Sequence, residues 1–299
     1  MKRHFIYLIN PVSGTKNKET LLRLIEKKTT GQGIPFQVLH TNINGNYAYL
    51  KDKITAEGIT DIIICGGDGS VNQVAGSLLG TDVNIGIIPM GSGNGLALAA
   101  GIPRKAYKAL DLIFKGNAAY IDAFRINTSF SCMLCGLGFD ALVAHEFATH
   151  ASRGLATYVK LTIRHFFKPK FYPFSIEAGN TSIQTNALFI SIANSNQFGN
   201  NFTIAPKASL HDGLLDIVVV NKMNKLTLLY KILKQIRAGE VKILSEENPD
   251  NKGILYFQAK KLVISNPSQA PLHIDGEPAK TASRLNIEII ENAFRLLQP

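Results

Sequence analysis

The sequence predicts an α/β protein, in which an N-terminal doubly wound parallel sheet is followed by a C-terminal antiparallel β-sandwich. Up to about residue 120, short apolar strands alternate with helical segments, which is the pattern of a parallel sheet covered by helices. Beyond that point, closely spaced strands separated by turn residues are typical of an antiparallel sandwich or barrel. The chain has 299 residues, enough for two domains with cores of their own.

In the first half, strands are expected at residues 4–9, 36–40, 61–65 and 84–88. Helices are expected at residues 17–28, 47–57, 71–79 and 96–100, and a further helix begins at Pro103, because proline suits the first helical turn. Apolar runs such as Ile62-Ile63-Ile64 do not alternate with polar residues, which indicates strands buried on both faces.

In the second half, the spacing predicts a hairpin of strands 120–127 and 129–136. Further strands are expected at residues 171–178, 182–193, 215–220, 254–258, 261–265, 271–274 and 285–290. Two helices, 153–167 and 225–237, interrupt them. The change of pattern therefore places a domain boundary after residue 120.

One loop follows the third strand with an unusual composition, Gly66-Gly67-Asp68-Gly69-Ser70. Glycines allow a ligand to approach the backbone closely, and the next helix points its first N–H groups at the loop. Such a strand, turn and helix N-terminus form an anion site, usually for phosphate. Asp68 would repel phosphate unless a cation lies between them, which suggests Mg²⁺ held with a nucleotide. An ordinary βα turn is the alternative.

Three other polar loops leave the carboxyl ends of predicted strands, at Asn10–Gly14, Thr41 and Gly91–Asn94. In an open parallel sheet these ends share one edge, where ligands bind. Each loop alone could be a turn or a helix cap, so the prediction of a nucleotide site depends on their convergence.

Several other sites are excluded or disfavoured. The chain has no Walker A motif, and Asn72 replaces the third glycine of a dinucleotide fingerprint. The three cysteines indicate a reducing compartment, and Cys132 and Cys135 are expected to be buried packing residues. His145 and His150 are five residues apart, so one helical face cannot present both to a metal. No apolar run is long enough to cross a membrane.

The net charge of +10 favours an anionic partner, although a solvated basic face is the alternative. Between Glu146 and Glu177 the chain carries five cations and no acid: Arg153, Lys160, Arg164, Lys168 and Lys170. They surround an apolar stripe of the predicted helix 153–167, made of Leu155, Tyr158, Val159, Thr162, Ile163 and Phe166. This stripe would pack into the sandwich by default, or rest on a membrane or line an acyl pocket. Nucleic-acid binding is disfavoured, because no recognition motif interleaves these charges with aromatic residues.

Six motifs occur in order along the chain: Asn10-Pro11-x-Ser13-Gly14, Gly66-Gly67-Asp68-Gly69-Ser70, Gly91-Ser92-Gly93-Asn94, Gly136-x-Gly138-Phe139-Asp140-Ala141, Asp212-Gly213-Leu214-Leu215-Asp216 and Asp275-Gly276-Glu277. Together they resemble the diacylglycerol kinase catalytic-domain family, in particular its bacterial soluble lipid kinases. The second motif is shared with NAD kinases and phosphofructokinases, whereas the late Asp-Gly-Glu selects lipid kinases. The match runs from residue 10 to about residue 277.

The resemblance implies ATP in a cleft between two domains, 1–120 and 121–284, with residues 285–299 returning to the first. It implies that Asp275 is the general base on a lipid hydroxyl, with Glu277 and Asp68 near Mg²⁺. A second, structural Mg²⁺ would bind Asp212 and backbone oxygens of Ser209 and Leu214. The nucleotide would be held by Asn10, Ser13, Thr41, Gly66, Gly67, Asp68, Gly69, Ser70, Asn72, Ser92 and Asn94.

One position departs from the family, since Gly95 stands where an Asp often contributes to the metal network. The leading hypothesis is an ATP-dependent, Mg²⁺-requiring lipid kinase that acts on diacylglycerol or a related long-chain lipid. It would be cytoplasmic and would bind the membrane surface peripherally. The sequence does not decide whether it forms a homodimer. The alternatives are an NAD kinase-like enzyme with a soluble acceptor and a non-catalytic regulator that binds nucleotide and lipid.

Overall fold

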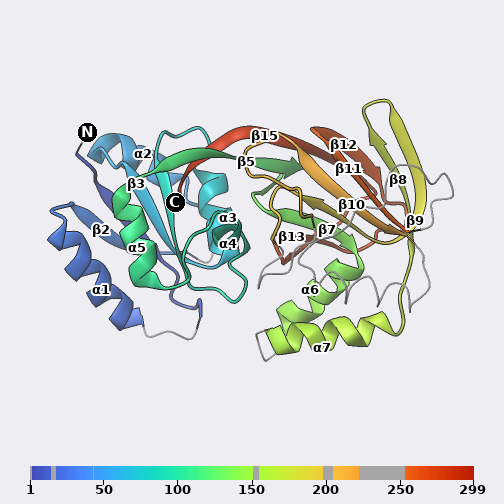
Figure 1. The fold of residues 1–299 in the computed structure, drawn as a ribbon, viewed down its shortest axis with the longest axis horizontal. Helices are drawn as coiled ribbons and strands as arrows, with labels where there is room; N and C mark the ends of the chain where they lie inside the picture. Colours follow the sequence, from blue (N-terminus) through green and yellow to red (C-terminus); the bar gives the residue numbers. More distant parts are fainter. Residues whose placement is uncertain (1, 15–17, 43, 151–154, 198–204, 222–252) are drawn as a thin grey trace. The chain divides into compact units, whose positions relative to one another are not determined.

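The computed structural model of the chain describes residues 2–14, 18–42, 44–150, 155–197, 205–221 and 253–299 (Figure 1). The chain divides into two compact units. Unit 1 comprises Met1–Asp122 and Glu291–Pro299, and unit 2 comprises Ala123–Ile290. The sequence predicts the corresponding domain boundaries after residues 120 and 284. Among the described residues, none of the helices combines the length and the apolar character needed to span a bilayer.

Unit 1 is built on a parallel sheet with the order β2-β1-β3-β4. The strands are β1 (Phe5–Ile9), β2 (Phe36–His40), β3 (Asp61–Gly66) and β4 (Asn84–Pro89). Every residue of β1 and β3 is buried, as expected for unbroken apolar runs between two layers of helices. The last strand, β15 (Arg284–Leu297), joins β4 in parallel at Arg295 and Leu296, so the chain's end completes this sheet.

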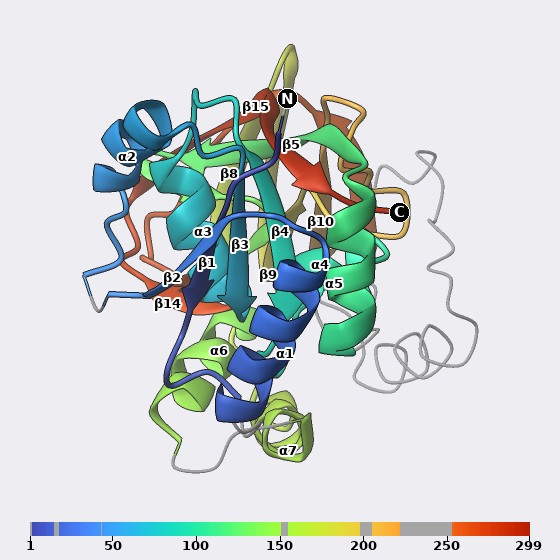
Figure 2. The same ribbon diagram turned by 90° about the vertical axis from the view of Figure 1, so that its left-hand side faces the viewer.

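Helices cover both faces of the unit 1 sheet (Figure 2). They are α1 (Lys18–Gly31), α2 (Tyr49–Glu57), α3 (Asp68–Ser77), α4 (Gly95–Ala99) and α5 (Ala106–Lys115). Helices α1 and α5 contact each other, and Phe114 of α5 stacks on Phe5 of β1. On the other face, the Ser77 hydroxyl of α3 accepts the Tyr47 N–H just before α2. The predicted doubly wound sheet is therefore confirmed.

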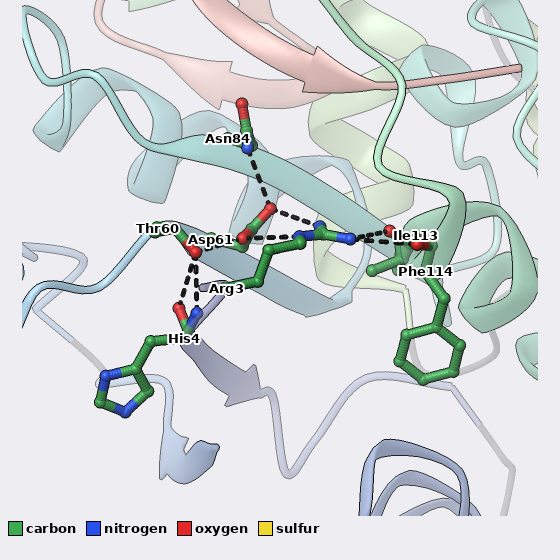
Figure 3. A network of polar contacts seen from close by, with 7 residues as sticks. All are labelled: Arg3, His4, Thr60, Asp61, Asn84, Ile113 and Phe114. Atoms are coloured by element: carbon green, nitrogen blue, oxygen red, sulfur yellow. Dashed lines mark hydrogen bonds and ion pairs between the residues drawn. The ribbon is translucent and has the colours of Figure 1, made fainter. Parts of the chain in front are cut away.

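A polar network closes the amino end of this sheet (Figure 3). Asp61, at the start of β3, is fully buried and accepts bonds from Arg3 Nη2 at 2.5 Å and from Arg3 Nε at 3.1 Å. Asn84, at the start of β4, donates to the same carboxylate at 3.0 Å. The guanidinium also donates to the Ile113 carbonyl at 2.7 Å and so binds the C-terminal turn of α5. The network therefore fixes the end of the sheet that lies opposite the glycine loops.

Unit 2 is an antiparallel sheet with the order β14-β13-β7-β9-β8-β12-β15. The sheet branches at β9, which also pairs with β10, and β10 pairs with β11. Alternate residues pack into one apolar core, which includes Phe124, Phe174, Ile190 and Ile264. The strands of the unit are β6 (Ser129–Ser131), β7 (Leu134–Gly138), β8 (Tyr172–Ala178), β9 (Thr181–Ala193), β10 (Leu215–Asn221), β11 (Ile254–Ala259), β12 (Lys261–Ser265), β13 (Leu272–Ile274), β14 (Glu277–Ala279) and most of β15.

Two predictions for unit 2 differ from the structure, and a third lies outside the described residues. The hairpin of β5 (Ala118–Ile126) with β6 is present, but the predicted strand 129–136 is interrupted at Cys132 and Met133. Helix α6 (Phe139–Thr149) was not predicted, because its apolar residues lie on several sides and show no amphipathic period. Helix α7 is described from Leu155 to Phe166, whereas the predicted helix 225–237 lies outside the described residues.

Candidate active site

The loops at the carboxyl ends of β1 and β3 are bonded to each other in unit 1. Asn10 Nδ2, just after β1, donates to the Ser70 hydroxyl at 2.8 Å, and the Asn10 N–H donates to the Cys65 carbonyl at 3.0 Å. Beside them, the Thr41 N–H after β2 donates to the Ile9 carbonyl at 3.0 Å. The structure therefore brings three of the four predicted loops to one edge of the sheet, as parallel strands require.

The fourth loop, which follows β4, packs backbone to backbone against the Gly66–Ser70 loop. A Cβ at Gly91 would come within 2.7 Å of the Gly67 Cα, so neither position tolerates a side chain without a shift. The Met90 N–H donates to the Gly66 carbonyl at 2.8 Å and fixes the two loops in register. This close approach requires glycine at both positions, which explains why both loops are rich in glycine.

Asp68 is the first residue of α3 and is half-buried. Its Oδ2 lies 3.0 Å from the position that a Cβ would take at Gly93, so the carboxylate lies beside the fourth loop. Gly69 and Asn72 lie in the first turn and a half of the same helix, whose N–H groups favour anions. A carboxylate at a phosphate-binding helix start fits a site where a cation lies between the two.

The remaining predicted nucleotide residues of unit 1 have distinct positions. Buried Asn94 bonds the backbone of Gly91 twice, since its Oδ1 accepts the N–H at 2.8 Å and its Nδ2 donates to the carbonyl at 2.7 Å. Ser92 is exposed between them, and the Ser13 hydroxyl donates to the Asn10 carbonyl at 3.2 Å. Asn94 therefore shapes the loop, whereas Ser92 presents its side chain to solvent.

Lys18 is a cation at this edge that the sequence alone did not single out. It begins α1, and its ammonium donates to the Ser13 carbonyl. Burial lowers the pKa of Lys18, and its position beside the first loop suits a phosphate neighbour. A lysine at the start of the helix after a glycine turn is the signal that could have found it.

In unit 2, Asp275 is buried at the tip of the β13–β14 hairpin, with only 5% of its surface exposed. Both turn residues, Asp275 and Gly276, have positive φ, at 49° and 83°. Asp-Gly is a common pair in two-residue hairpin turns, and the turn it forms here also places the carboxylate inside the unit.

Five neutral donors surround the Asp275 carboxylate. Oδ1 accepts the Ser131 hydroxyl at 2.6 Å and the N–H groups of Met133 and Leu134 at 3.1 and 3.0 Å. Oδ2 accepts the Cys132 N–H at 3.1 Å and, weakly, the Cys132 thiol at 3.6 Å. An ionised carboxylate only accepts hydrogen bonds, and this set of donors suits that form.

The break between β6 and β7 supplies those donors. If residues 129–136 formed one strand, as predicted, the N–H groups of residues 132–134 would be committed to a sheet ladder. Because the chain turns at Cys132 and Met133, these groups face the carboxylate instead. Cys132 is therefore not only a packing residue, while Cys65 and Cys135 are buried and burial raises the pKa of both thiols.

Glu277 and the loop Ser209–Leu214 hold the other predicted metal ligands. Glu277 is exposed at the start of β14. The Asp212 carboxylate is exposed and accepts the Leu214 N–H at 3.1 Å, while the Ser209 hydroxyl accepts the His211 N–H at 3.3 Å. Burial raises the pKa of neighbouring Asp216 to about 7, against the opposing hydrogen bond from Gln258.

Carboxylate and carbonyl oxygens are the ligands that Mg²⁺ prefers, so the donor types of this loop fit that ion. The same holds for the carboxylates of Asp68 in unit 1 and Glu277 in unit 2. Within the described part of the chain, however, no three His, Cys, Asp or Glu side chains cluster as a ready metal site. Magnesium at these positions therefore stays a prediction.

The two units define a known class of protein. The diacylglycerol kinase catalytic domain model matches residues 4–126, and the YegS C-terminal NAD kinase β-sandwich-like domain model matches residues 134–298. A crystal structure of a diacylglycerol kinase from Bacillus anthracis strain Sterne has the same fold, with a TM-score of 0.73 over 100% of this chain and 97% of that one. Sequence identity to it is 20%, so this likeness bears on the fold alone.

Sequence relatives then give the family. "Probable lipid kinase YegS" of Salmonella arizonae and "Probable lipid kinase YegS-like" of Citrobacter koseri are each 30% identical over 276 residues. Each alignment covers 90% of this chain and 88% of the relative. The chain belongs to the diacylglycerol kinase catalytic-domain family, in the branch of YegS-like lipid kinases. The resemblance inferred from the six motifs is thus confirmed.

Proposed function

We propose that this protein is an ATP-dependent lipid kinase that phosphorylates the hydroxyl of diacylglycerol or a related long-chain lipid. The observation that carries the proposal is the buried Asp275 carboxylate, held in a left-handed turn by the Ser131 hydroxyl, three backbone N–H groups and a thiol. Membership of the lipid kinase family and the names of the sequence relatives support it.

In the proposed reaction, Asp275 accepts the proton of the lipid hydroxyl while the hydroxyl oxygen forms a bond to the γ-phosphorus of ATP. The bond from that phosphorus to the bridging oxygen of ADP breaks, and ADP leaves with the bonding electron pair. Among the described contacts, Oδ1 of Asp275 accepts three hydrogen bonds, and Oδ2 accepts the Cys132 N–H and, weakly, the Cys132 thiol.

The glycine loops of unit 1 would hold the nucleotide. The first N–H groups of α3 attract phosphate, and the side chains of Asn10, Ser13, Thr41 and Ser92 lie at the same sheet edge for further hydrogen bonds. When bound, Mg²⁺ neutralises charge on the transferred phosphoryl group. Asp68 and Glu277 are the carboxylates proposed to hold it, and Asp212 with Ser209 and Leu214 a structural ion.

We further propose that α7 rests on an anionic membrane surface. Within the predicted apolar stripe of this helix, Tyr158 packs edge-on against Phe147, whereas Val159 and Ile163 are exposed by 45 and 54%. Burial of the whole stripe, the default expectation, is therefore wrong. Val159 and Ile163 are spaced by four and lie on one helical face, and exposed Phe167 directly follows the helix. Lys160 and Arg164 are next to these two residues, Arg164 is ion-paired with Glu146, and Lys168 and Lys170 follow the helix.

Phosphate transfer tests the lipid kinase. The protein is incubated with ATP labelled in its γ-phosphate, Mg²⁺ and mixed micelles of a bacterial lipid extract. Asp275→Asn should reduce labelling of lipid by about 10²- to 10⁴-fold while nucleotide binding persists, because a general base contributes about that factor. The matched control is Glu288→Gln, which removes an exposed carboxylate of the same unit and should leave labelling unchanged.

Other outcomes favour the alternatives. Label on NAD or a sugar would indicate an enzyme with a soluble acceptor. If no acceptor is labelled although nucleotide still binds, the non-catalytic regulator is favoured. The position to test is then Gly95, which begins α4 and stands where the family often has an Asp of the metal network.

Vesicle sedimentation tests the membrane surface. Ile163→Asp and Phe167→Asp should each release the protein from phosphatidylglycerol vesicles, since an acidic group opposes both insertion and attraction to anionic lipid. Val12→Asp is the control, because Val12 is an exposed apolar residue of unit 1. Equal binding of all variants would contradict the proposal.

A further inference from the structure

One motif of the sequence has no part in the proposed phosphate transfer, Gly136-x-Gly138-Phe139-Asp140. In the structure it ends β7 and begins α6. Asp140 lies in the first turn of α6 and is 7% exposed. Its carboxylate lies against His273 of β13, a fully buried residue two positions before Asp275.

His273 lies between two partners. Its Nε2 is 3.3 Å from Asp140 Oδ2, and its Nδ1 accepts the N–H of Gly276 at 3.3 Å. Since Nδ1 acts as an acceptor, the neutral ring carries its proton on Nε2 and donates it to the carboxylate. The other oxygen of Asp140 accepts the N–H of Ala141 at 2.8 Å. The pair thus joins the start of α6 to the second residue of the Asp275–Gly276 turn.

Gly136 makes room for this pair. It lies directly opposite His273 in the β7–β13 register. A Cβ at Gly136 would lie 1.9 Å from Asp140 Oδ2 and 2.5 Å from His273 Nε2, closer than nonbonded atoms approach. The first glycine of the motif is therefore required by the side chains that meet above it.

We propose that Asp140 and His273 are positioning residues for Asp275, an inference that rests on the proposed phosphate transfer. Asp275 and Gly276 both have left-handed backbone, the conformation that an Asp-Gly pair favours in a two-residue hairpin turn. The His273 bond to the Gly276 N–H fixes this turn on one side, while the Asp275 N–H bond to the Leu134 carbonyl at 2.8 Å fixes it on the other. Asp140 selects the tautomer of His273 that can accept from Gly276.

Two substitutions at His273 separate the two bonds. His273→Asn places an amide oxygen near the position of Nδ1, so it can still accept from Gly276 but loses Asp140. His273→Gln places an amide nitrogen near the position of Nε2, so it can still donate to Asp140 but leaves the Gly276 N–H without its acceptor. Asp140→Asn is a third variant, in which the oxygen of the side-chain amide can still accept a hydrogen bond from the His273 ring.

We expect His273→Gln to lower kcat by about 10- to 100-fold with KM for ATP and lipid unchanged, because small misplacements of a reacting group cost that much. His273→Asn should retain kcat to within about threefold. The Gly276 amide, followed by ¹H–¹⁵N NMR, should exchange faster with solvent in His273→Gln than in wild type and His273→Asn.

The inference is overturned if His273→Gln keeps wild-type kcat, or if both His273 variants lose turnover equally while the Gly276 amide is unchanged. Failure of the proposed function is seen separately, as an absence of lipid labelling in the wild type. In that case the amide exchange alone decides whether the pair fixes the turn.

Discussion

Asp61 and Asp275 are both buried aspartates next to short strands, and their described partners differ. Asp61, at the amino end of the unit 1 sheet, is bound by the Arg3 guanidinium, so a positive charge balances its own (Figure 3). The described donors to Asp275 include a hydroxyl, a thiol and backbone N–H groups. The contacts of Asp61 join β3 to the end of α5 through Arg3, whereas those of Asp275 join its turn to the break between β6 and β7.

The two ends of the unit 1 sheet also differ. At the amino end, Arg3 and Asn84 donate to one carboxylate, and the guanidinium also bonds the end of α5. At the carboxyl end, glycine loops approach each other backbone to backbone, and the side chains of Asn10 and Asn94 bond within and between them. The amino end is therefore held by a charged network, and the carboxyl end consists of the loops that carry the predicted nucleotide residues.

The comparison predicts that Asp61→Asn has the largest effect on stability. Breaking a buried ion pair by removing one partner leaves the other charge uncompensated and costs about 3–5 kcal/mol of unfolding free energy. Urea denaturation measures this loss. Turnover per folded molecule should be unchanged, so a specific loss of kcat in this variant would contradict the structural role of Asp61.

Ser131→Ala tests the neutral donors of Asp275. A hydrogen bond to a charged group contributes about 1.5–3 kcal/mol, and the Ser131 hydroxyl is at 2.6 Å from Oδ1. The loss of stability should shrink in an Asp275→Asn background, because the two residues interact directly. A double-mutant cycle by urea denaturation gives the coupling, and additive losses would show that the hydroxyl does not stabilise the carboxylate.

Asp216 is another buried aspartate, and the Gln258 amide donates to both of its carboxylate oxygens at 3.3 Å. Because burial raises its pKa from 3.8 to about 7, the folded metal-free protein binds a proton that the unfolded chain releases. Its stability should therefore fall as the pH rises from about 4 to about 7. Asp216→Asn should remove this pH dependence, and at pH 8 in EDTA the variant should be more stable to unfolding than the wild type. Identical profiles of stability against pH for the two proteins would contradict this prediction.

The smallest effect is expected for Cys132→Ala. The thiol is a weak donor at 3.6 Å from Asp275 Oδ2, and the stronger backbone bond from the same residue remains. Turnover should stay within about threefold of the wild type, and stability should fall by about 1 kcal/mol for the lost volume. A loss of kcat as large as that of Asp275→Asn would assign the thiol a part in proton transfer.

Local sequence was sufficient for the loops of unit 1 because each is defined by its neighbours along the chain. An unbroken apolar run followed by glycines is a buried strand with a ligand-binding turn, and the parallel topology then brings Asn10, Thr41, Gly67 and Gly91 to one edge. The family motifs likewise located Asp275, whose Asp-Gly pair alone indicated only a hairpin.

The surroundings of Asp275 could not be read from the sequence. Its donors lie about 140 residues earlier in the chain, at a break that interrupts an apparently regular strand. Helix α6 lacks a clear amphipathic period, so the contact of Asp140 with His273, which lies 133 residues away in the chain, could not be predicted either. The sequence by itself determined the strands of unit 1, the glycine turns and the family. Only the tertiary structure decided which groups surround the buried carboxylates, because their partners come from segments far apart in the chain.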